Sequence, residues 1–224
     1  MTRRILMMIT CAILCAHHVY AQHFMVGLSA GPVVSDVQGM DTRDDDNDFY
    51  KVGISAGAFV NRKINRKNTL QLEINYVQKG TEQLPDSTNN GYFKLVLNYV
   101  EVPFIIRHRI LFNPRKKAYN NFEWELGASG GYLFSTKFID NGYNLLLEPN
   151  SYNKTDVSIL GGINYRFPNG FYFSARYSNS VIPVIKRSAI PVAVLSAYPF
   201  SANNGDNMVF QFCIKYVFGD TKDK

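Results

Sequence analysis

Six charged residues occupy positions where a strand-like alternation would turn them to the same side as glycine and serine. They are Glu73, Glu123, Glu125, Arg166, Arg176 and Lys215. Carboxylates and cations can neutralise one another across a narrow interior, whereas an isolated ion in such a dehydrated space is strongly unfavourable. We therefore predict a lumen charge network that fills and stabilises a closed interior. The alternative is a lining for conduction of ions or small solutes.

No catalytic centre is expected. Beyond residue 21 the histidines are His23 and His108, and neither has an evident nucleophile or acid–base partner. Cys213 would be the one cysteine left after removal of residues 1–21, so the chain could form neither an internal disulfide nor a site built from several cysteines. We predict a non-enzymatic protein that has no cofactor and no metal.

Two segments are candidates for interaction. The run from 44 to 48 begins like a calcium-binding loop, but Phe49 and Ser55 stand where that loop needs glycine and glutamate. A solvated acidic loop is the default reading, with a looser calcium or lipopolysaccharide-bridging ion as the alternative. The segment 181–202 is apolar and interrupted by prolines, so it is either a partner site or a cover for the barrel mouth. The candidate residues are Asp44, Asp46, Asp48, Ile190, Val192, Tyr198 and Phe200.

Regular strands must position these residues, because apolar and polar side chains alternate with a period of two from Gln22 onward. The alternation predicts eight antiparallel strands of about ten residues, each with an aliphatic–aromatic face and a face of Gly, Ser and charge. In the segment 92–111, Leu95, Leu97 and Tyr99 share one face. The alternation becomes unclear at 101–103, where we expect a bulge or bend.

The sequence favours a transmembrane barrel over a soluble one. Small residues and charges suit a narrow lumen better than a water-exposed surface, and aromatic residues gather towards the strand ends. Short connections (61–68, 113–121 and 168–170) alternate with long ones (35–48, 80–91, 136–154 and 180–206). This alternation is typical of short periplasmic turns and long extracellular loops. A secreted lipocalin-like barrel that binds a ligand is the alternative.

The N-terminal 21 residues have the pattern of a cleavable signal peptide. Arg3 and Arg4 precede an apolar run from Ile5 to Ala16, and Val19 and Ala21 suit cleavage before Gln22. The run is too short to span a membrane. Cleavage would leave a barrel domain at 22–218 and a short polar tail at 219–224, in the outer membrane of a Gram-negative cell.

The net charge of +6 does not indicate nucleic-acid binding, because the chain has no basic helix and an exported barrel has no access to nucleic acid. The basic residues concentrate instead in two predicted turns, at 62–67 and 115–117, which contain no acidic residue. They are either solvated turns or groups that lie near anionic lipid headgroups on the inner side.

The segment Leu97-Asn98-Tyr99-Val100-Glu101-Val102-Pro103-Phe104 resembles the Y-[LI]-E-[IV]-P segment of PorT-like small outer-membrane β-barrel proteins. The run Gly127-Ala128-Ser129-Gly130-Gly131-Tyr132 is similar to the G-x-x-x-G-Y strand that follows it there. The resemblance implies an all-β, up-and-down barrel, with Tyr216 and Phe218 as the closing signal read by the barrel-assembly machinery. The family's founding member is linked to secretion across the outer membrane, but the matched motifs are structural and carry no such role.

We therefore expect an eight-stranded outer-membrane barrel with a plugged polar lumen, acting as a structural or interaction protein through its outer loops. A narrow porin-like channel is the main alternative. The expected partners are outer-membrane lipids and lipopolysaccharide, the barrel-assembly machinery, and an unidentified protein at the outer loops.

Overall fold

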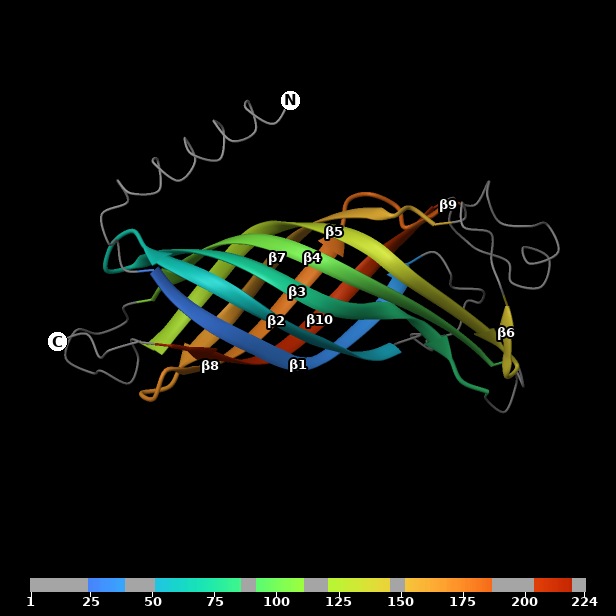
Figure 1. The fold of residues 1–224 in the computed structure, drawn as a ribbon, viewed down its shortest axis with the longest axis horizontal. Coiled ribbons are helices and arrows are strands. Elements are labelled where there is room, and N and C mark those ends of the chain that lie inside the picture. Colours follow the sequence, from blue (N-terminus) through green and yellow to red (C-terminus); the bar gives the residue numbers. More distant parts are fainter. Residues whose placement is uncertain are drawn as a thin grey trace, which may run out of the picture.

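Eight long antiparallel strands close into a ring in the computed structural model of the protein (Figure 1). The structure describes residues 24–38, 51–85, 92–110, 121–145, 152–186 and 204–218. Each long strand pairs with the next along the chain, and β1 pairs with β10 to close the ring. The long strands are β1 (Phe24–Gln38), β2 (Lys51–Lys63), β3 (Asn68–Gln83), β4 (Phe93–Arg109), β5 (Phe122–Asp140), β7 (Thr155–Arg166), β8 (Phe171–Ser180) and β10 (Asn204–Val217). Two short strands, β6 (Tyr143–Leu145) and β9 (Ile185–Lys186), pair with β5 and β10.

The fold prediction is confirmed, whereas the predicted signal peptide (1–21) and tail (219–224) lie outside the described residues. All seven candidate loop residues also lie outside them: Asp44, Asp46, Asp48, Ile190, Val192, Tyr198 and Phe200.

The two ends of the barrel differ (Figure 1). The short connections β2–β3 and β7–β8, the start of β1 and the end of β10 lie at one end, which we call the turn end. The other end, which we call the loop end, includes β6 and β9.

The barrel wall has an apolar outside and a polar inside. Large apolar side chains are exposed on every long strand, among them Leu28, Ile54, Ile74, Phe104, Leu126, Ile159, Phe173 and Ile214. The interior contains many buried Asn, Gln, Ser and charged side chains, together with smaller apolar groups. This polarity is that of a barrel in lipid and the reverse of a lipocalin-like barrel. Among the described residues, no helix is long and apolar enough to span a membrane.

Aromatic side chains form a row near each end of the apolar wall. At the turn end, Phe171 contacts Tyr216, which contacts Phe218. Towards the loop end, Tyr76 pairs with Phe134. From Phe122 to Phe134 the strand advances about 40 Å, or about 30 Å along the axis at a typical tilt of about 40°. That height suits the hydrocarbon region of a bilayer.

Towards the loop end, beyond Tyr76 and Phe134, the strand β4 continues with the opposite polarity. In β4 the outward residues change from Val100, Val102 and Phe104 to Asn98 and Lys94, with Val96 between them, while Leu95 and Leu97 point inward and are fully buried. We call the wall formed by 76–83, 93–99 and 133–145 the extension, because it continues the barrel beyond this aromatic pair. Its inner face carries Leu95 and Leu97 on β4 but the polar residues Lys79, Thr81 and Gln83 on β3.

This inversion corrects the expectation of a bulge at 101–103. The strand β4 keeps its alternation throughout, and Tyr99, Glu101 and Pro103 all point inward. The irregularity lies instead in β5, where pairing shifts from Asn98–Ser135 to Tyr99–Leu133 and leaves Phe134 as the extra residue. The alternation looked unclear in the sequence because the polarity of the faces changes near Tyr99. The pairing of β4 with β3 is also interrupted at Val102 and Pro103.

The strands are also longer than the expected ten residues or so. β1, β3 and β5 extend to Gln38, Gln83 and Asp140, well into segments expected to be loops. A strand that leaves the bilayer can continue because its backbone groups still pair with a neighbouring strand.

Gly80 is a position where the extension requires glycine. Its φ is +137°, and an added Cβ would lie 1.9 Å from the carbonyl oxygen of Leu95 in the neighbouring strand. We expect Gly80→Ala to lower the free energy of unfolding by about 1–3 kcal/mol, the usual magnitude for strain of this kind. Gly130→Ala is the matched control, because an added Cβ there would meet nothing within 4 Å. Equal urea midpoints for the two variants would contradict the prediction.

Candidate functional site

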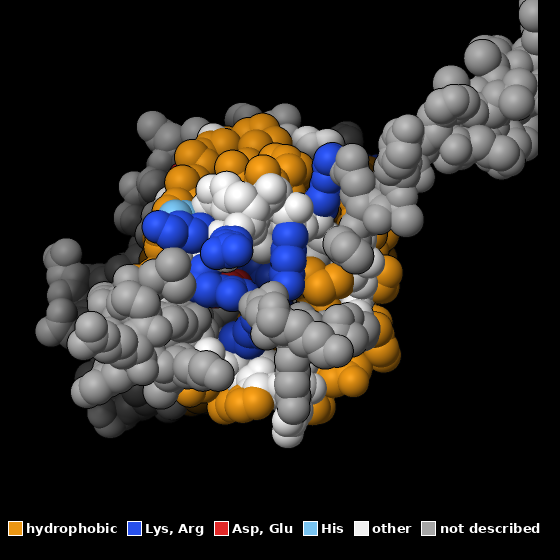
Figure 2. All heavy atoms as spheres, turned by 90° about the vertical axis from the view of Figure 1, so that its left-hand side faces the viewer, with side chains coloured by type: hydrophobic (Ala, Val, Ile, Leu, Met, Phe, Trp, Pro, Cys, Tyr) orange, Lys and Arg blue, Asp and Glu red, His pale blue; other side chains and the backbone are white. Residues whose placement is uncertain are grey.

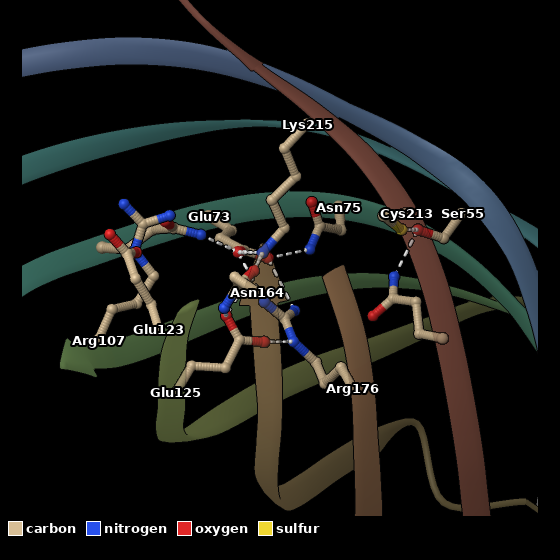
Figure 3. Close-up of polar contacts among 12 residues, drawn as sticks. Ser55, Glu73, Asn75, Arg107, Glu123, Glu125, Asn164, Arg176, Cys213 and Lys215 are labelled. Atoms are coloured by element: carbon tan, nitrogen blue, oxygen red, sulfur yellow. Dashed lines mark hydrogen bonds and ion pairs between the residues drawn. The ribbon is translucent and has the colours of Figure 1, made fainter. Parts of the chain in front are cut away.

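A buried cluster of four charged side chains occupies the middle of the lumen, and we call it the central cluster. It comprises Glu73 from β3, Glu125 from β5, Arg176 from β8 and Lys215 from β10, all at most 6 % exposed. Figure 3 shows these side chains pointing toward one another from four different strands. Two carboxylates and two cations give the cluster a formal charge of zero.

Arg176 links the two carboxylates. Its Nη1 and Nη2 donate to Glu73 at 2.9 and 2.8 Å, and its Nε donates to Glu125 at 2.6 Å (Figure 3). The guanidinium fork therefore binds one carboxylate through two nitrogens and the other through the third, a geometry that lysine cannot reproduce. Lys215 Nζ lies 3.4 Å from Glu125 Oε2 and 3.6 Å from Glu73 Oε1.

Amide side chains complete the hydrogen bonding of both carboxylates. Asn75 donates to Glu73 at 2.7 Å, Gln71 also donates to Glu73, and Asn164 donates to Glu125 at 2.8 Å. A buried ion costs least when it is both paired and hydrogen-bonded, so the cluster is a strongly connected plug across the barrel.

A glycine makes room for the cluster. Gly162 pairs with both Arg176 and Glu125 in the sheet. A Cβ at this position would lie 3.0 Å from the Arg176 Cα and 3.1 Å from Glu125 Oε1. The register therefore places the smallest residue between the two charged side chains that must meet.

A second cluster lies between the central cluster and the loop end. Lys79 Nζ lies 2.5 Å from Glu101 Oε1 and 2.8 Å from Asp156 Oδ2. Its ammonium group also stands 4.9 Å from the centre of the Tyr99 ring, within cation–π range. Asn207 donates to Asp156 at 3.3 Å. We call Lys79, Glu101 and Asp156 the upper cluster.

The two segments that resemble PorT-like motifs lie beside the upper cluster. The segments 97–104 and 127–132 lie side by side on β4 and β5, where Glu101 pairs with Gly131 and Val100 with Tyr132. A Cβ on Gly131 would touch Glu101 at 3.4 Å, so the glycine leaves room for the carboxylate that binds Lys79. The motifs are therefore structural elements of the wall and its filling.

Near the turn end, Glu123 lies 3.4 Å from Arg107 and 3.5 Å from Arg109. The Arg107 guanidinium stands 5.1 Å from the centre of the Tyr172 ring. Tyr172 packs with Phe59 and Val217, so an apolar group and a paired arginine share this level of the lumen.

Four of the six predicted network residues thus meet in the central cluster, and Glu123 pairs with arginines nearer the turn end. Arg166, the sixth residue, is the last residue of β7. It points inward, is half-buried, and is the cross-strand neighbour of Tyr172. Lys79, Glu101, Asp156 and Arg107 were not among the residues predicted from the sequence for this network. The sequence could have revealed Lys79 and Asp156. Each lies an even number of residues along its strand from a polar lumen residue, Glu73 and Ser158 respectively, and therefore points to the same side of the wall.

His108 takes no part in the lumen. It lies on the outward face near the turn end, where its Nδ1 is 2.6 Å from Asn68 Oδ1 and its ring stacks on Trp124 at 5.4 Å. His23 lies outside the described residues. Tyr216 and Phe218, the predicted assembly signal, form an edge-to-face pair on the outside of the wall.

The loop end of the lumen is filled by apolar side chains, which we call the apolar plug. Its members are Val37, Phe93, Leu95, Leu97, Tyr99, Leu133, Phe138, Tyr152 and Val184. The segments carrying Tyr152 and Val184 are tied to the wall, because Leu133 N donates to Lys154 O at 2.7 Å and Val184 N donates to Gly205 O at 2.7 Å.

Lys51 lies beside the extension and is fully buried. Its Nζ donates to the Gln78 side chain at 3.0 Å. Burial, with a smaller effect of nearby Lys94, lowers the pKa of Lys51 to about 8, and Glu82 opposes this shift. Part of the Lys51 population is therefore neutral near pH 8.

The sequence profile of the family described as "Outer membrane protein beta-barrel domain" matches residues 20–186. No curated protein is similar enough in sequence to match the chain. Among solved structures, the chain is similar to Ail, the attachment invasion locus protein of Yersinia pestis, with 15% identity, a TM-score of 0.44, and coverage of 87% of this chain and 98% of Ail. Neisserial surface protein A shows 13% identity, a TM-score of 0.41 and coverage of 86% and 96%. OprG of Pseudomonas aeruginosa shows 11% identity, a TM-score of 0.35 and coverage of 87% and 95%.

Proposed function

The chain belongs to the outer membrane protein beta-barrel domain family, and from that premise we propose that it is a closed, non-enzymatic barrel that acts through its loop end. In this proposal the strands anchor the protein in the outer membrane, the lumen provides rigidity, and the extension presents a binding surface outside the cell. The turn end faces the periplasm, in keeping with its short connections.

The filling of the lumen is the observation that carries this proposal. The central cluster, the upper cluster and the apolar plug lie at successive levels, and each joins residues from several strands. An eight-stranded barrel has an interior only wide enough for side chains, so no continuous path for a solute is expected.

The extension supports an interaction role. Its outer surface is polar, with an ion pair at 2.9 Å between Lys94 and Glu82. Its edge strand β6 exposes Tyr143, whose side chain is 76% exposed. A rigid, water-facing sheet with its own apolar core is suited to contact another macromolecule without rearrangement.

One observation favours a narrow channel as the second candidate. Among the described residues, several buried polar atoms in the lumen have no hydrogen-bond partner in the protein, including both side-chain atoms of Asn61 and the Gln71 Oε1 atom. Buried polar groups are normally satisfied, so these positions favour contact with water. Water could then occupy the part of the lumen near the turn end.

Single-channel recording separates the two candidates. We expect the full chain, refolded and inserted into a planar bilayer, to show no steady conductance steps. As a positive control, the combined variant Leu95→Ala, Leu97→Ala and Arg176→Ala should introduce measurable conductance, because it shortens side chains both in the apolar plug and in the central cluster. Steady steps in the unmodified protein would overturn the closed-barrel proposal and support the channel.

A photo-crosslinking residue at Tyr143 tests the interaction role in intact cells. The proposal expects one dominant protein adduct from this position and none from Ile159, which is exposed on the lipid face. A PorT-like, secretion-associated role would require that adduct to be a component of a secretion system. Adducts with lipid alone at both positions would contradict an interaction role for the extension.

A further inference from the structure

The described charges at the turn end are strongly unbalanced. Figure 2 shows Lys and Arg side chains gathered over this end of the barrel, inside a rim of hydrophobic side chains. The charged residues at this end comprise one acid, Glu123, and seven bases: Arg62, Lys63, Arg66, Lys67, Arg107, Arg109 and Arg166. Glu123 pairs with Arg107 and Arg109, and four of the seven bases, Arg62, Lys63, Arg66 and Lys67, lie in the turn between β2 and β3.

This turn, residues 62–67, has a composition and position suited to a membrane surface, and we call it the basic turn. Its four cationic side chains are exposed, and between them stands Ile64, which is 57% exposed. Arg62 continues the outward row of β2, and its guanidinium lies 6.0 Å from the centre of the Phe24 ring. Phe24 is itself an exposed residue of the apolar wall, so Arg62 stands where lipid tails give way to headgroups.

Hydrogen bonds hold the basic turn in a defined shape. The Asn65 side chain accepts from the backbone N–H groups of Lys67 at 2.9 Å and Asn68 at 2.7 Å. The N–H of Arg109 in β4 donates to the carbonyl of Lys67 at 2.8 Å. The turn is therefore fixed to two strands, and less conformational entropy is lost when its side chains bind a ligand.

We propose that the basic turn binds the phosphate groups of anionic phospholipids in the leaflet on its own side of the membrane. The cations supply the charge, and Ile64 supplies an apolar contact with the bilayer. The other described short turn, at 167–170, lies at the same end without a charged residue, so depth in the membrane alone does not dictate a basic turn. Each Lys or Arg near an anionic membrane surface contributes about a fivefold gain in binding at moderate salt.

Lipid selectivity measured with spin-labelled phosphatidylglycerol and phosphatidylcholine tests the proposal. The full chain would be refolded into vesicles of phosphatidylcholine with about one third phosphatidylglycerol. We expect preferential association of phosphatidylglycerol, and a loss of about fivefold in selectivity for each cation removed, or about 25-fold for the double variant Arg66→Gln and Lys67→Gln. High salt should remove the preference in the unmodified protein, because it screens exposed charges.

The matched control is Lys137→Gln with Lys154→Gln, which removes two exposed cations near the loop end. It should leave the selectivity unchanged. Equal losses in the two double variants, or an unmodified protein without selectivity, would overturn the proposal. Salt-sensitive binding of isolated peptidoglycan by the basic turn, without lipid selectivity, would likewise overturn it and assign an acidic polymer as the ligand. None of these results depends on whether the extension binds a partner.

Discussion

Arg176→Met is expected to lower the free energy of unfolding by about 3–5 kcal/mol, because it leaves two buried carboxylates with a single cation. Arg176 supplies all three hydrogen bonds from cations to Glu73 and Glu125 that are shorter than 3 Å. Lys215, at 3.4 and 3.6 Å, is too far away to replace them. Urea unfolding in phospholipid vesicles, followed by tryptophan fluorescence and by heat-modifiable migration on gels, measures the effect.

Two comparisons separate the loss of charge pairing from a general effect of substitution. Lys94→Met removes one partner of an ion pair whose side chains are 28% and 17% exposed, and it should cost less than about 1 kcal/mol. Glu73→Gln combined with Arg176→Met leaves the neutral pair of Glu125 and Lys215, so it should recover part of the stability. If the double variant were less stable than Arg176→Met alone, the central cluster would not be a charge-neutral unit.

The second large effect concerns the change of polarity along β4. Val102→Arg places a charge on the lipid face, at a side chain that is 46% exposed, and it should cost about 2–4 kcal/mol. Leu97→Ala, five residues away on the same strand, creates a cavity in the apolar plug. It should cost about 2–5 kcal/mol although it adds no polar group. The same measurements of urea unfolding apply.

Ser135→Arg is the control for this pair. Ser135 is exposed on the outside of the extension, opposite Asn98 and just beyond Phe134. A charge there would remain in water and should change stability by less than about 0.5 kcal/mol. A cost for Ser135→Arg equal to that for Val102→Arg would place the extension inside the bilayer. A negligible cost for Leu97→Ala would show that the apolar plug does not stabilise the barrel.

The sequence alone could place the residues of the central cluster on the polar face, because the face on which a side chain lies depends only on its position along its own strand. Glu73, Glu125, Arg176 and Lys215 each alternate with apolar neighbours, which assigns each to the polar face before any contact is known. Which charges meet was not accessible, because strand tilt and register bring residues from β3, β5, β8 and β10 to the same level of the lumen. Glu123 instead pairs with Arg107 and Arg109 of the neighbouring strand β4, where Arg109 is its direct cross-strand partner.

The sequence by itself determined the class of the protein: alternating faces and alternating connection lengths indicate a membrane barrel, because lipid outside and side chains inside impose a period of two on every strand. Only the tertiary structure decided where the apolar side chains change from the outer face of the wall to the inner face. Leu95, Leu97 and Tyr99 have the same period of two as the rest of β4, and a period does not reveal which face meets lipid. Whether lipid or water lies on each side of the wall decides which face is apolar. Beyond Tyr76 and Phe134 the outward residues of β4 become mainly polar while Leu95 and Leu97 point into the barrel, as expected where a wall leaves lipid for water.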